Sequence, residues 1–353
     1  MRVTHYARQS VVAAALALAL AACGKDSSAP SEFNPAGTSA DMTATESAFS
    51  TEQMSSFAVL GTDISAKLNG TALVMNSALA VRGATGDAAR YARELTALVP
   101  RSGAFPASLA LIPSQYLGTT FVWDVDSSAY VASDLAGAPS AGVRFLLYAV
   151  DPVLRQPVMP LVEVGYVDVT DHSTTSTVDV SVKVVEGSVV YLEYDVTGHA
   201  TATGGVITIS GFASDGTTLA NFDLNNTISD INGSPVIAFD YHIAVPSRHL
   251  SLSWTATISY ISDTEMAVAL NFSIIGPNGS VQLLGSYTLS GGTLTVKVNG
   301  AVFATVNLDG VDPVITGADG QPLTADEEAS MQTILEFYLN SPEVFTGLLA
   351  PVA

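Results

Sequence analysis

The chain has 353 residues, with 13 lysines and arginines against 33 aspartates and glutamates, a formal net charge of −20, and one cysteine. Clustered Lys and Arg carry binding to nucleic acids and to anionic lipid headgroups, so this composition excludes both partners as the default. One cysteine excludes an internal disulfide. Charged residues make up only 13% of the chain, and the abundance of Ser, Thr, Gly and Val indicates a β-rich exported protein.

The first 22 residues have the pattern of an export signal. Arg2 and Arg8 precede an apolar run over residues 11–22. That run is too short to span a bilayer, which takes about 20 apolar residues. The segment ends in a sequence that resembles the lipobox of bacterial lipoproteins, and the only cysteine of the chain stands at its required position: Leu20-Ala21-Ala22-Cys23.

The lipobox resemblance implies a modified N-terminus. In proteins of this class the cysteine thiol receives a diacylglyceryl group, the signal is cut before it, and the new amine is acylated. We therefore expect Cys23 to be the lipid attachment site, through which the protein is anchored to the membrane. Gly24, where Asp would favour retention at the inner membrane, implies the outer membrane. The alternative is a cleaved, soluble exported protein with an incidental cysteine.

Two segments are predicted after the signal peptide of residues 1–22. Residues 23–50 are rich in Ser, Ala, Pro and Thr, and this composition predicts a disordered tether because it buries little apolar surface. Residues 51–349 are predicted to form a single mainly-β domain. Its helices are expected at about 51–99 and 324–340, and its strands at about 119–308.

Helical periodicity supports the flanking helices. A capping-box pattern at residues 50–53 precedes an apolar stripe, formed by Phe57, Leu60, Ile64 and Leu68. A second stripe over residues 87–99 ends at Pro100. Near the C-terminus, Thr324 and Glu327 have the spacing of a capping box.

Between these flanks the apolar period changes to two, which is typical of half-buried antiparallel strands. Four turns fix the expected register. Gly291-Gly292 as a two-residue loop pairs Tyr287 with Val296 and Leu289 with Leu294, and the 276–279 loop pairs Ile274 with Val281. The 246–249 loop pairs Tyr241 with Trp254, and Asn299-Gly300 requires an extra bulged residue nearby.

Successive short hairpins predict a large curved antiparallel up-and-down sheet or half-barrel. A sheet of this size must have its apolar face covered, and the N- and C-terminal helices are the expected cover. A β-sandwich is the alternative architecture.

Signs of enzyme chemistry are weak, and we expect neither an enzyme nor a cofactor. No recognised nucleophile, phosphate-binding or zinc motif is present in the sequence. Asp240 and His242 share the polar face of one strand with Ser253 opposite, which makes a hydrolase a remote alternative. Three groups of acidic residues fit ordinary turns better than a metal site, with calcium as the alternative for the last two: Asp168 with Asp171 and His172; Asp223 with Asn225, Asp230 and Asn232; Asp309 with Asp312 and Asp319.

Aromatic residues on the apolar strand phase are the candidate ligand-binding residues. They would line a cavity for a lipid or another hydrophobic molecule if the sheet is open, and otherwise they fill a packed core. The sequence thus predicts an envelope lipoprotein that binds a hydrophobic ligand; the alternative is a structural or interaction lipoprotein with a packed core and a Ser/Thr-rich face for an envelope protein. The candidate residues are Trp123, Tyr241, Trp254, Tyr260, Phe272 and Tyr287.

Overall fold

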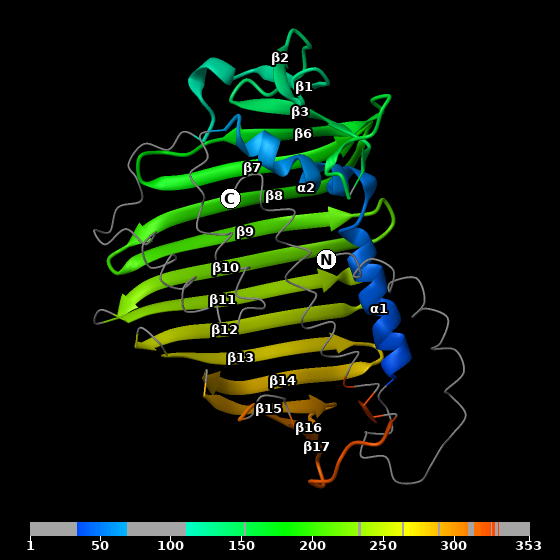
Figure 1. Cartoon of the computed structure of the whole chain (residues 1–353), viewed down its shortest axis with the longest axis vertical. Helices are drawn as coiled ribbons and strands as arrows, with labels where there is room; N and C mark the ends of the chain where they lie inside the picture. The colour runs from blue at the N-terminus through cyan, green and yellow to red at the C-terminus, as the bar shows by residue number, and fades with distance from the viewer. Residues whose placement is uncertain are drawn as a thin grey trace.

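A single open sheet of 15 strands dominates the fold, with two helices at its N-terminal side (Figure 1). The computed structural model describes residues 34–68, 111–151, 153–231, 234–262, 265–288, 290–309, 314–325, 327–328 and 331. The helices are α1 (Pro35–Ala48) and α2 (Glu52–Ser65). No helix in these ranges is long and apolar enough to cross a membrane.

The strands follow one another from residue 119 to residue 317, close to the predicted span. The first six are β1 (Thr119–Asp124), β2 (Ala129–Ser133), β3 (Gly142–Tyr148), β4 (Val150–Asp151), β5 (Gln156–Pro157) and β6 (Glu163–Asp171). The next six are β7 (Thr177–Glu186), β8 (Val189–Thr201), β9 (Gly204–Ser214), β10 (Leu219–Ile231), β11 (Ser234–Val245) and β12 (Leu250–Ser262). The last five are β13 (Glu265–Gly276), β14 (Gly279–Thr288), β15 (Gly291–Val298), β16 (Ala301–Asn307) and β17 (Val314–Gly317).

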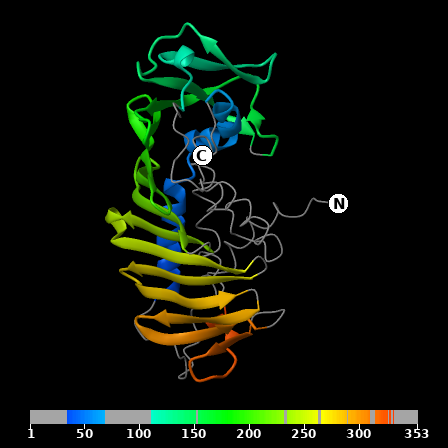
Figure 2. The same cartoon turned by 90° about the vertical axis from the view of Figure 1, so that its left-hand side faces the viewer.

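The predicted up-and-down meander is confirmed from β6 to β17, where every strand pairs antiparallel with its neighbours in sequence. The first strands depart from this order, because β1 lies between β2 and β3 and pairs with β3 in parallel. The sheet does not close into a barrel, and β4 with β5 forms a separate small hairpin. Figure 2 shows that the sheet is strongly curved, with α2 inside the curve.

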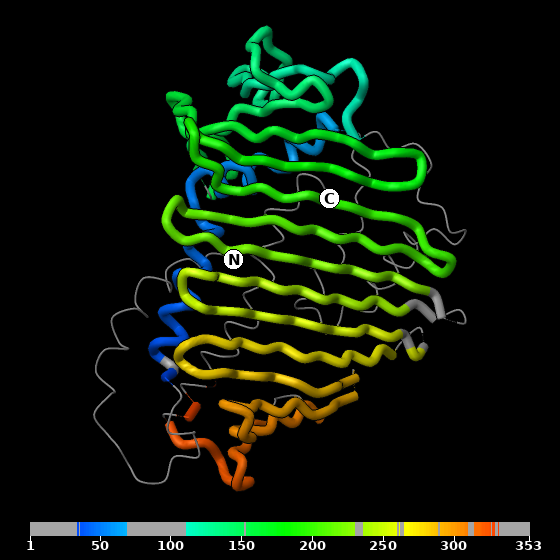
Figure 3. The backbone as a smooth tube through the Cα atoms, turned by 180° about the vertical axis from the view of Figure 1, so that it is seen from behind, coloured from blue at the N-terminus to red at the C-terminus, as the bar shows by residue number. Residues whose placement is uncertain are grey.

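Alternation along the strands divides the sheet into two chemically different faces. On β7, for example, Val180, Val182 and Val184 are buried, whereas Ser181 and Lys183 are partly exposed. The apolar face points into the curve, because the buried side of α2 packs on it near β3, β6 and β7. The polar face forms the outer side, seen in Figure 3. One apolar core runs along the inner face of the sheet.

Three of the four register predictions are confirmed. Ile274 pairs with Val281 across the 277–278 turn. Tyr241 pairs with Trp254. A register shift follows Val296 in the pairing of β15 with β16, which is the bulge expected beside Asn299-Gly300.

The fourth register prediction, at Gly291-Gly292, is wrong. These glycines belong to β15, where Gly291 pairs with Thr288 and Gly292 with Tyr287. Close backbone approach explains the misplacement, since a Cβ atom on Gly292 would lie 2.5 Å from the carbonyl oxygen of Ser286. Val296 consequently pairs with Leu283, four residues from its expected partner. An even shift keeps the same side chains on the same face, so the apolar and polar faces remain as predicted.

Helix α2 confirms the first predicted helical stripe, but it begins one residue later than its cap pattern indicates. Thr51 is the N-cap and accepts a hydrogen bond from the Met54 backbone N–H at 3.3 Å. Gln53 does not close a capping box; it donates to Glu186 on β7 at 2.7 Å. The buried stripe comprises Phe57, Leu60, Ile64 and, just after the helix, Leu68.

Helix α1 lies inside the segment predicted to be a disordered tether, so that prediction is wrong for residues 35–48. Asn34 caps the helix by accepting from the Gly37 backbone N–H at 3.0 Å, and Pro35 occupies the first turn. The buried residues of the helix include Thr38, Asp41 and Thr45. A helix that buries polar side chains lacks the apolar stripe on which the sequence prediction depends.

The predicted C-terminal helix is confirmed only at its start. The Thr324 backbone N–H donates to Glu327 Oε2 at 2.8 Å, and the Glu327 N–H donates to Thr324 Oγ1 at 3.4 Å, which are the reciprocal bonds of a capping box. Residues 325, 327, 328 and 331 are helical. The rest of that helix, the helix predicted over 87–99, the signal peptide and Cys23 lie outside the described residues.

Candidate functional site

The structure brings three of the six candidate aromatic residues together on the inner face. Tyr241, Trp254 and Phe272 are consecutive cross-strand partners on β11, β12 and β13. The Tyr241 and Trp254 rings meet edge to face, with their centroids 5.6 Å apart. Tyr241 is 5% and Phe272 2% exposed, so this aromatic ladder is part of the packed core.

The other three candidates do not join the aromatic ladder. Trp123 lies on β1, seven strands from β11 in the sheet order, which is about 34 Å at the usual strand spacing. It packs instead against Tyr130, with ring centroids 5.5 Å apart. Tyr287 pairs with Val268, four residues along β13 from Phe272. The Tyr260 side chain lies outside the described part of the structure.

A polar pair that the sequence did not reveal lies beside the aromatic ladder. The Tyr241 hydroxyl donates to Asn226 Oδ1 at 2.8 Å, and both side chains are buried. Burial raises the pKa of Tyr241. The Tyr241 hydroxyl is therefore neutral across the physiological range.

The predicted Asp240, His242 and Ser253 grouping exists, but its contacts are not those of an activated nucleophile. His242 Nε2 lies 3.1 Å from Asp240 Oδ1, and the two side chains are 57% and 54% exposed. Ser253 is the cross-strand partner of His242, yet among the described residues its Oγ has its hydrogen bond with Ser273 Oγ, at 2.8 Å. A base-activated serine needs a hydrogen bond to the histidine.

Polar side chains form continuous rows across the outer face. One row crosses 11 strands, and ten of its 11 positions are Asp, Asn or Thr. No side chain in this polar row is buried. It runs through Asp179, Thr197, Thr208, Asn225, Asp240, Thr255, Asn271, Leu284, Thr295, Thr305 and Thr316.

A charged row crosses the same face near β3. Arg144 makes two hydrogen bonds to Asp168, at 2.7 and 2.8 Å, and its guanidinium carbon lies 3.6 Å from the centre of the Tyr166 ring. The hydrogen bonds to Asp168 raise the pKa of Arg144. On the next strands Lys183 and Glu193 form an exposed ion pair at 3.1 Å. These opposite charges pair within the sheet.

Members of the acidic groups weighed as turns or metal sites accept hydrogen bonds from backbone N–H groups. Asp171 accepts from the Ser173 backbone N–H at 2.9 Å, and Asp319 accepts from that of Gln321 at 2.9 Å. Asp309 accepts from the Gly292 N–H at 2.9 Å. The described part of the chain has no group of three or more His, Cys, Asp or Glu residues that could hold a metal ion. Asn232, Asp312 and the Asp230 side chain lie outside it.

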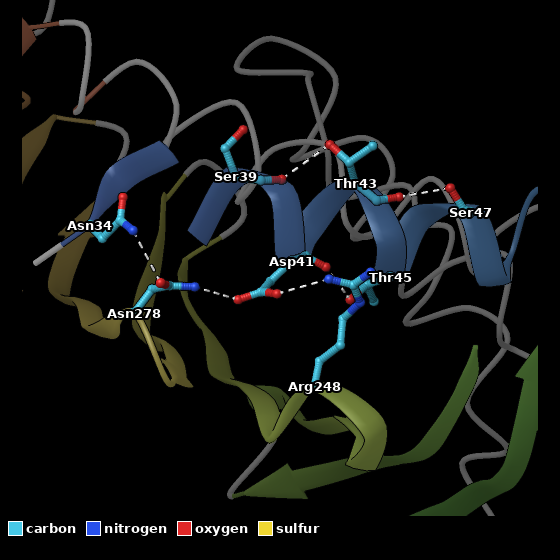
Figure 4. A network of polar contacts seen from close by, with 8 residues as sticks. All are labelled: Asn34, Ser39, Asp41, Thr43, Thr45, Ser47, Arg248 and Asn278. Carbon is cyan, nitrogen blue, oxygen red and sulfur yellow. Dashed lines mark hydrogen bonds and ion pairs between the residues drawn. The ribbon is translucent and has the colours of Figure 1, made fainter. Parts of the chain in front are cut away.

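A polar clasp holds α1 across the ends of the strands (Figure 4). Asp41 Oδ1 accepts from Arg248 Nη1 at 3.1 Å, and Asp41 Oδ2 accepts from Asn278 Nδ2 at 2.8 Å. Asn278 Oδ1 in turn accepts from Asn34 Nδ2 at 3.2 Å. Arg248 lies in the β11–β12 turn and Asn278 in the β13–β14 turn, so the turns of two hairpins bind the same helix. We call Asn34, Asp41, Arg248 and Asn278 the α1 clasp.

No signal in the sequence indicates the α1 clasp. Asp41 and Arg248 are separated by more than 200 positions, and each is an ordinary residue for its local setting. Gly37 lets Asn278 approach α1 closely, since a Cβ atom at position 37 would lie 2.3 Å from Asn278 Oδ1. Only the tertiary fold brings these residues to one place.

The comparisons with known proteins give no family. Neither a protein-family model, nor a curated protein, nor a solved structure matches the chain.

Proposed function

We propose that the chain is a lipid-anchored protein of the bacterial envelope that binds a partner protein through the polar outer face of its sheet. The lipobox with Cys23 supports the anchor, and its outer-membrane location remains part of the proposal. The observation that carries the binding role is the polar row across 11 strands.

The chemistry of the outer face favours binding over simple solvation. A solvated surface ordinarily holds about 25–35% charged residues, whereas in the polar row two of the 11 positions are charged, both Asp, and eight are Asn or Thr. Short Ser, Thr and Asn side chains lose less rotamer entropy than Lys or Glu when a partner immobilises them. They also offer both donors and acceptors at regular strand spacing.

Site-specific photocrosslinking in cells tests this proposal. A photoreactive amino acid at Asn271 or at Thr197, both exposed on the polar row, should capture the same dominant partner protein. The same group at Asp126, exposed in the β1–β2 turn, should not. The double variant Thr197→Lys with Asn271→Lys should abolish the complex, because it adds two unpaired charges to the interface.

Two results would contradict the binding role. One is crosslinking that yields no common partner from the two polar-row positions. The other is equal capture from Asp126.

The anchor has a separate test: Cys23→Ser should release the protein from the membrane fraction, and continued membrane association would contradict the lipid attachment.

A second candidate function is binding of a hydrophobic ligand on the inner face, where the aromatic ladder would form the binding surface. Tyr241 and Phe272 are almost fully buried, so a ligand must displace packed side chains to reach them. Organic extraction of the purified protein followed by mass spectrometry tests this function. A lipid recovered in stoichiometric amount, and lost on Phe272→Ala, would support it, and a clean extract would count against it.

A further inference from the structure

The described structure has a concentration of exposed aliphatic side chains between β3 and β6. Residues 117–162 hold nine of the 15 large hydrophobic residues exposed in the described structure, and five of these lie in the excursion between β3 and β6. Val153 and Leu154 are 76% and 70% exposed, so most of the surface of each residue is in contact with water. Such a local cluster is the kind of patch that marks a protein or membrane contact. The five are Val153, Leu154, Val158, Met159 and Val162.

The turn that carries Val153 and Leu154 satisfies its own backbone groups. Asp151 Oδ1 accepts from the N–H groups of Val153 and Leu154, at 2.8 and 3.0 Å, and its carbonyl accepts from Arg155 N–H at 2.8 Å. Val158 N–H donates to the carbonyl of Ala149 at 2.8 Å. An apolar environment accepts backbone only when its hydrogen bonds are made internally. This turn therefore presents two aliphatic side chains without exposing these N–H groups.

The excursion lies on the same edge of the sheet as α1 (Figures 1 and 3). The β11–β12 and β13–β14 turns, which carry Arg248 and Asn278, belong to this edge and hold α1 there. The β3–β6 excursion joins it because β3 ends and β6 begins beside the β7–β8 turn. We call this side of the sheet the α1 edge.

The anchor has a limited reach from the α1 edge. Cys23 precedes Asn34 by 11 residues, which span at most about 36–40 Å when fully extended. Asn34 is bound to Asn278 in the β13–β14 turn, and β14 has 10 residues, or about 34 Å at the rise of an antiparallel strand. Only an almost fully extended chain could therefore carry the anchor to the opposite edge, whereas the α1 edge lies beside Asn34.

We propose that the α1 edge faces the membrane that holds the lipid anchor and that the β3–β6 excursion inserts Val153 and Leu154 into the bilayer surface. This inference rests on the proposed anchor at Cys23. The occupant of the exposed patch is the bilayer itself, because the anchor brings it to this edge. The net charge of −20 assigns the contact to apolar burial rather than to charge attraction.

Fluorescence of a single label tests the insertion. Leu154→Cys in the full chain, purified with its lipid and reconstituted into phosphatidylcholine vesicles, receives an environment-sensitive fluorophore on its free thiol. We expect a blue shift of the emission and quenching by lipids that carry a quencher in the acyl chain. The matched control is Ile261→Cys, which is also an exposed aliphatic position at 57% but lies at the opposite edge; its label should show neither effect.

The outcomes separate the insertion from the anchor. Vesicle flotation and the mass of the N-terminal peptide show whether Cys23 holds the protein on the membrane. Protein that floats while the label at position 154 behaves as in water overturns the insertion alone. Protein that does not float and carries no lipid overturns both proposals. Equal quenching at positions 154 and 261 also overturns the insertion, because it shows no preferred edge.

Discussion

Tyr241 and Asn226 form a neutral polar pair inside an otherwise apolar face. Their side chains meet at 2.8 Å, and the pair satisfies two groups that burial has removed from water. When a mutation removes one partner of such a pair, most of the loss of stability comes from the other partner, which stays buried without a hydrogen bond. Removal of either partner is therefore expected to destabilise the fold.

We expect Tyr241→Phe to lower the free energy of unfolding by about 1–3 kcal/mol, because it leaves the buried Asn226 carbonyl without its donor. Tyr287→Phe is the matched control: the Tyr287 hydroxyl has no hydrogen bond among the described residues, and we expect a change within about 0.5 kcal/mol. Urea unfolding at equilibrium measures both. Equal losses in the two variants would contradict the role given to Asn226.

At the scale of elements, α1 shows how a helix can be held by polar contacts. Three of its side-chain hydroxyls donate to the carbonyl four residues earlier, which satisfies them inside the helix: Thr43, Thr45 and Ser47. The α1 clasp then supplies the contacts to the sheet. Helix α2 packs on the sheet through an apolar stripe. In α1 these hydrogen bonds, together with the buried apolar residues Met42 and Ala48, hold the helix to the sheet instead.

We expect Asp41→Ala to loosen α1 while the sheet stays folded, because it leaves Arg248 and Asn278 without their shared acceptor. Arg248 is partly exposed, so the cost lies between the value of about 1 kcal/mol for a surface ion pair and that of about 3–5 kcal/mol for breaking a buried one. Hydrogen exchange should rise at residues 38–48 and stay unchanged in β7–β9. The control is Glu46→Ala, at an exposed position on the same helix. If hydrogen exchange at residues 38–48 rises equally in this variant, the role given to the α1 clasp is contradicted.

At the scale of the whole molecule, buried tyrosines are distributed along the sheet. Burial raises the pKa of Tyr130, Tyr194 and Tyr241 above the ordinary value of 10. Tyr130 and Tyr194 lie on β2 and β8, and Tyr241 lies on β11. Ionisation at any of these positions therefore requires opening of the core.

We expect global stability to fall as the pH rises above 10. The unfolded chain loses the tyrosine protons there, whereas the folded chain keeps them, so the unfolded state is favoured by about 1.4 kcal/mol per pH unit for each such tyrosine. Below pH 10 both states hold the protons, and these groups give no pH dependence. Denaturation followed at several alkaline pH values should show this slope.

A control variant tests the assignment of that slope. Tyr194→Phe removes one titrating group. The loss of unfolding free energy above pH 10 should therefore become smaller by about 1.4 kcal/mol per pH unit, whatever the variant does to stability at neutral pH. Ultraviolet absorbance of the native protein provides an independent reading. Free titration of all three tyrosines near pH 10 in the folded state would contradict their burial.

The strand pattern was readable from the sequence because its cause is local. Alternation assigns each side chain to a face, and hairpin turns set the pairing of neighbours such as Tyr241 with Trp254. Gly291 and Gly292 show where local sequence fails to predict the pairing. Glycine is favoured both in a turn and where two strands approach closely, and only the neighbouring strand shows which of the two applies. The predicted pairing of β14 with β15 was displaced by four residues, and because four is an even number each side chain stays on its predicted face.

The sequence by itself determined the mainly-β class, the two faces of the sheet and the α2 stripe, because each follows from the spacing of residues within one element. The tertiary structure decided the existence of α1, the separation of Trp123 from the aromatic ladder, and the single edge shared by α1 and the β3–β6 excursion. These depend on contacts between residues far apart in the chain, such as Asp41 with Arg248. No local periodicity encodes such contacts, since their stability comes from desolvation and hydrogen bonding that exist only after the sheet has formed.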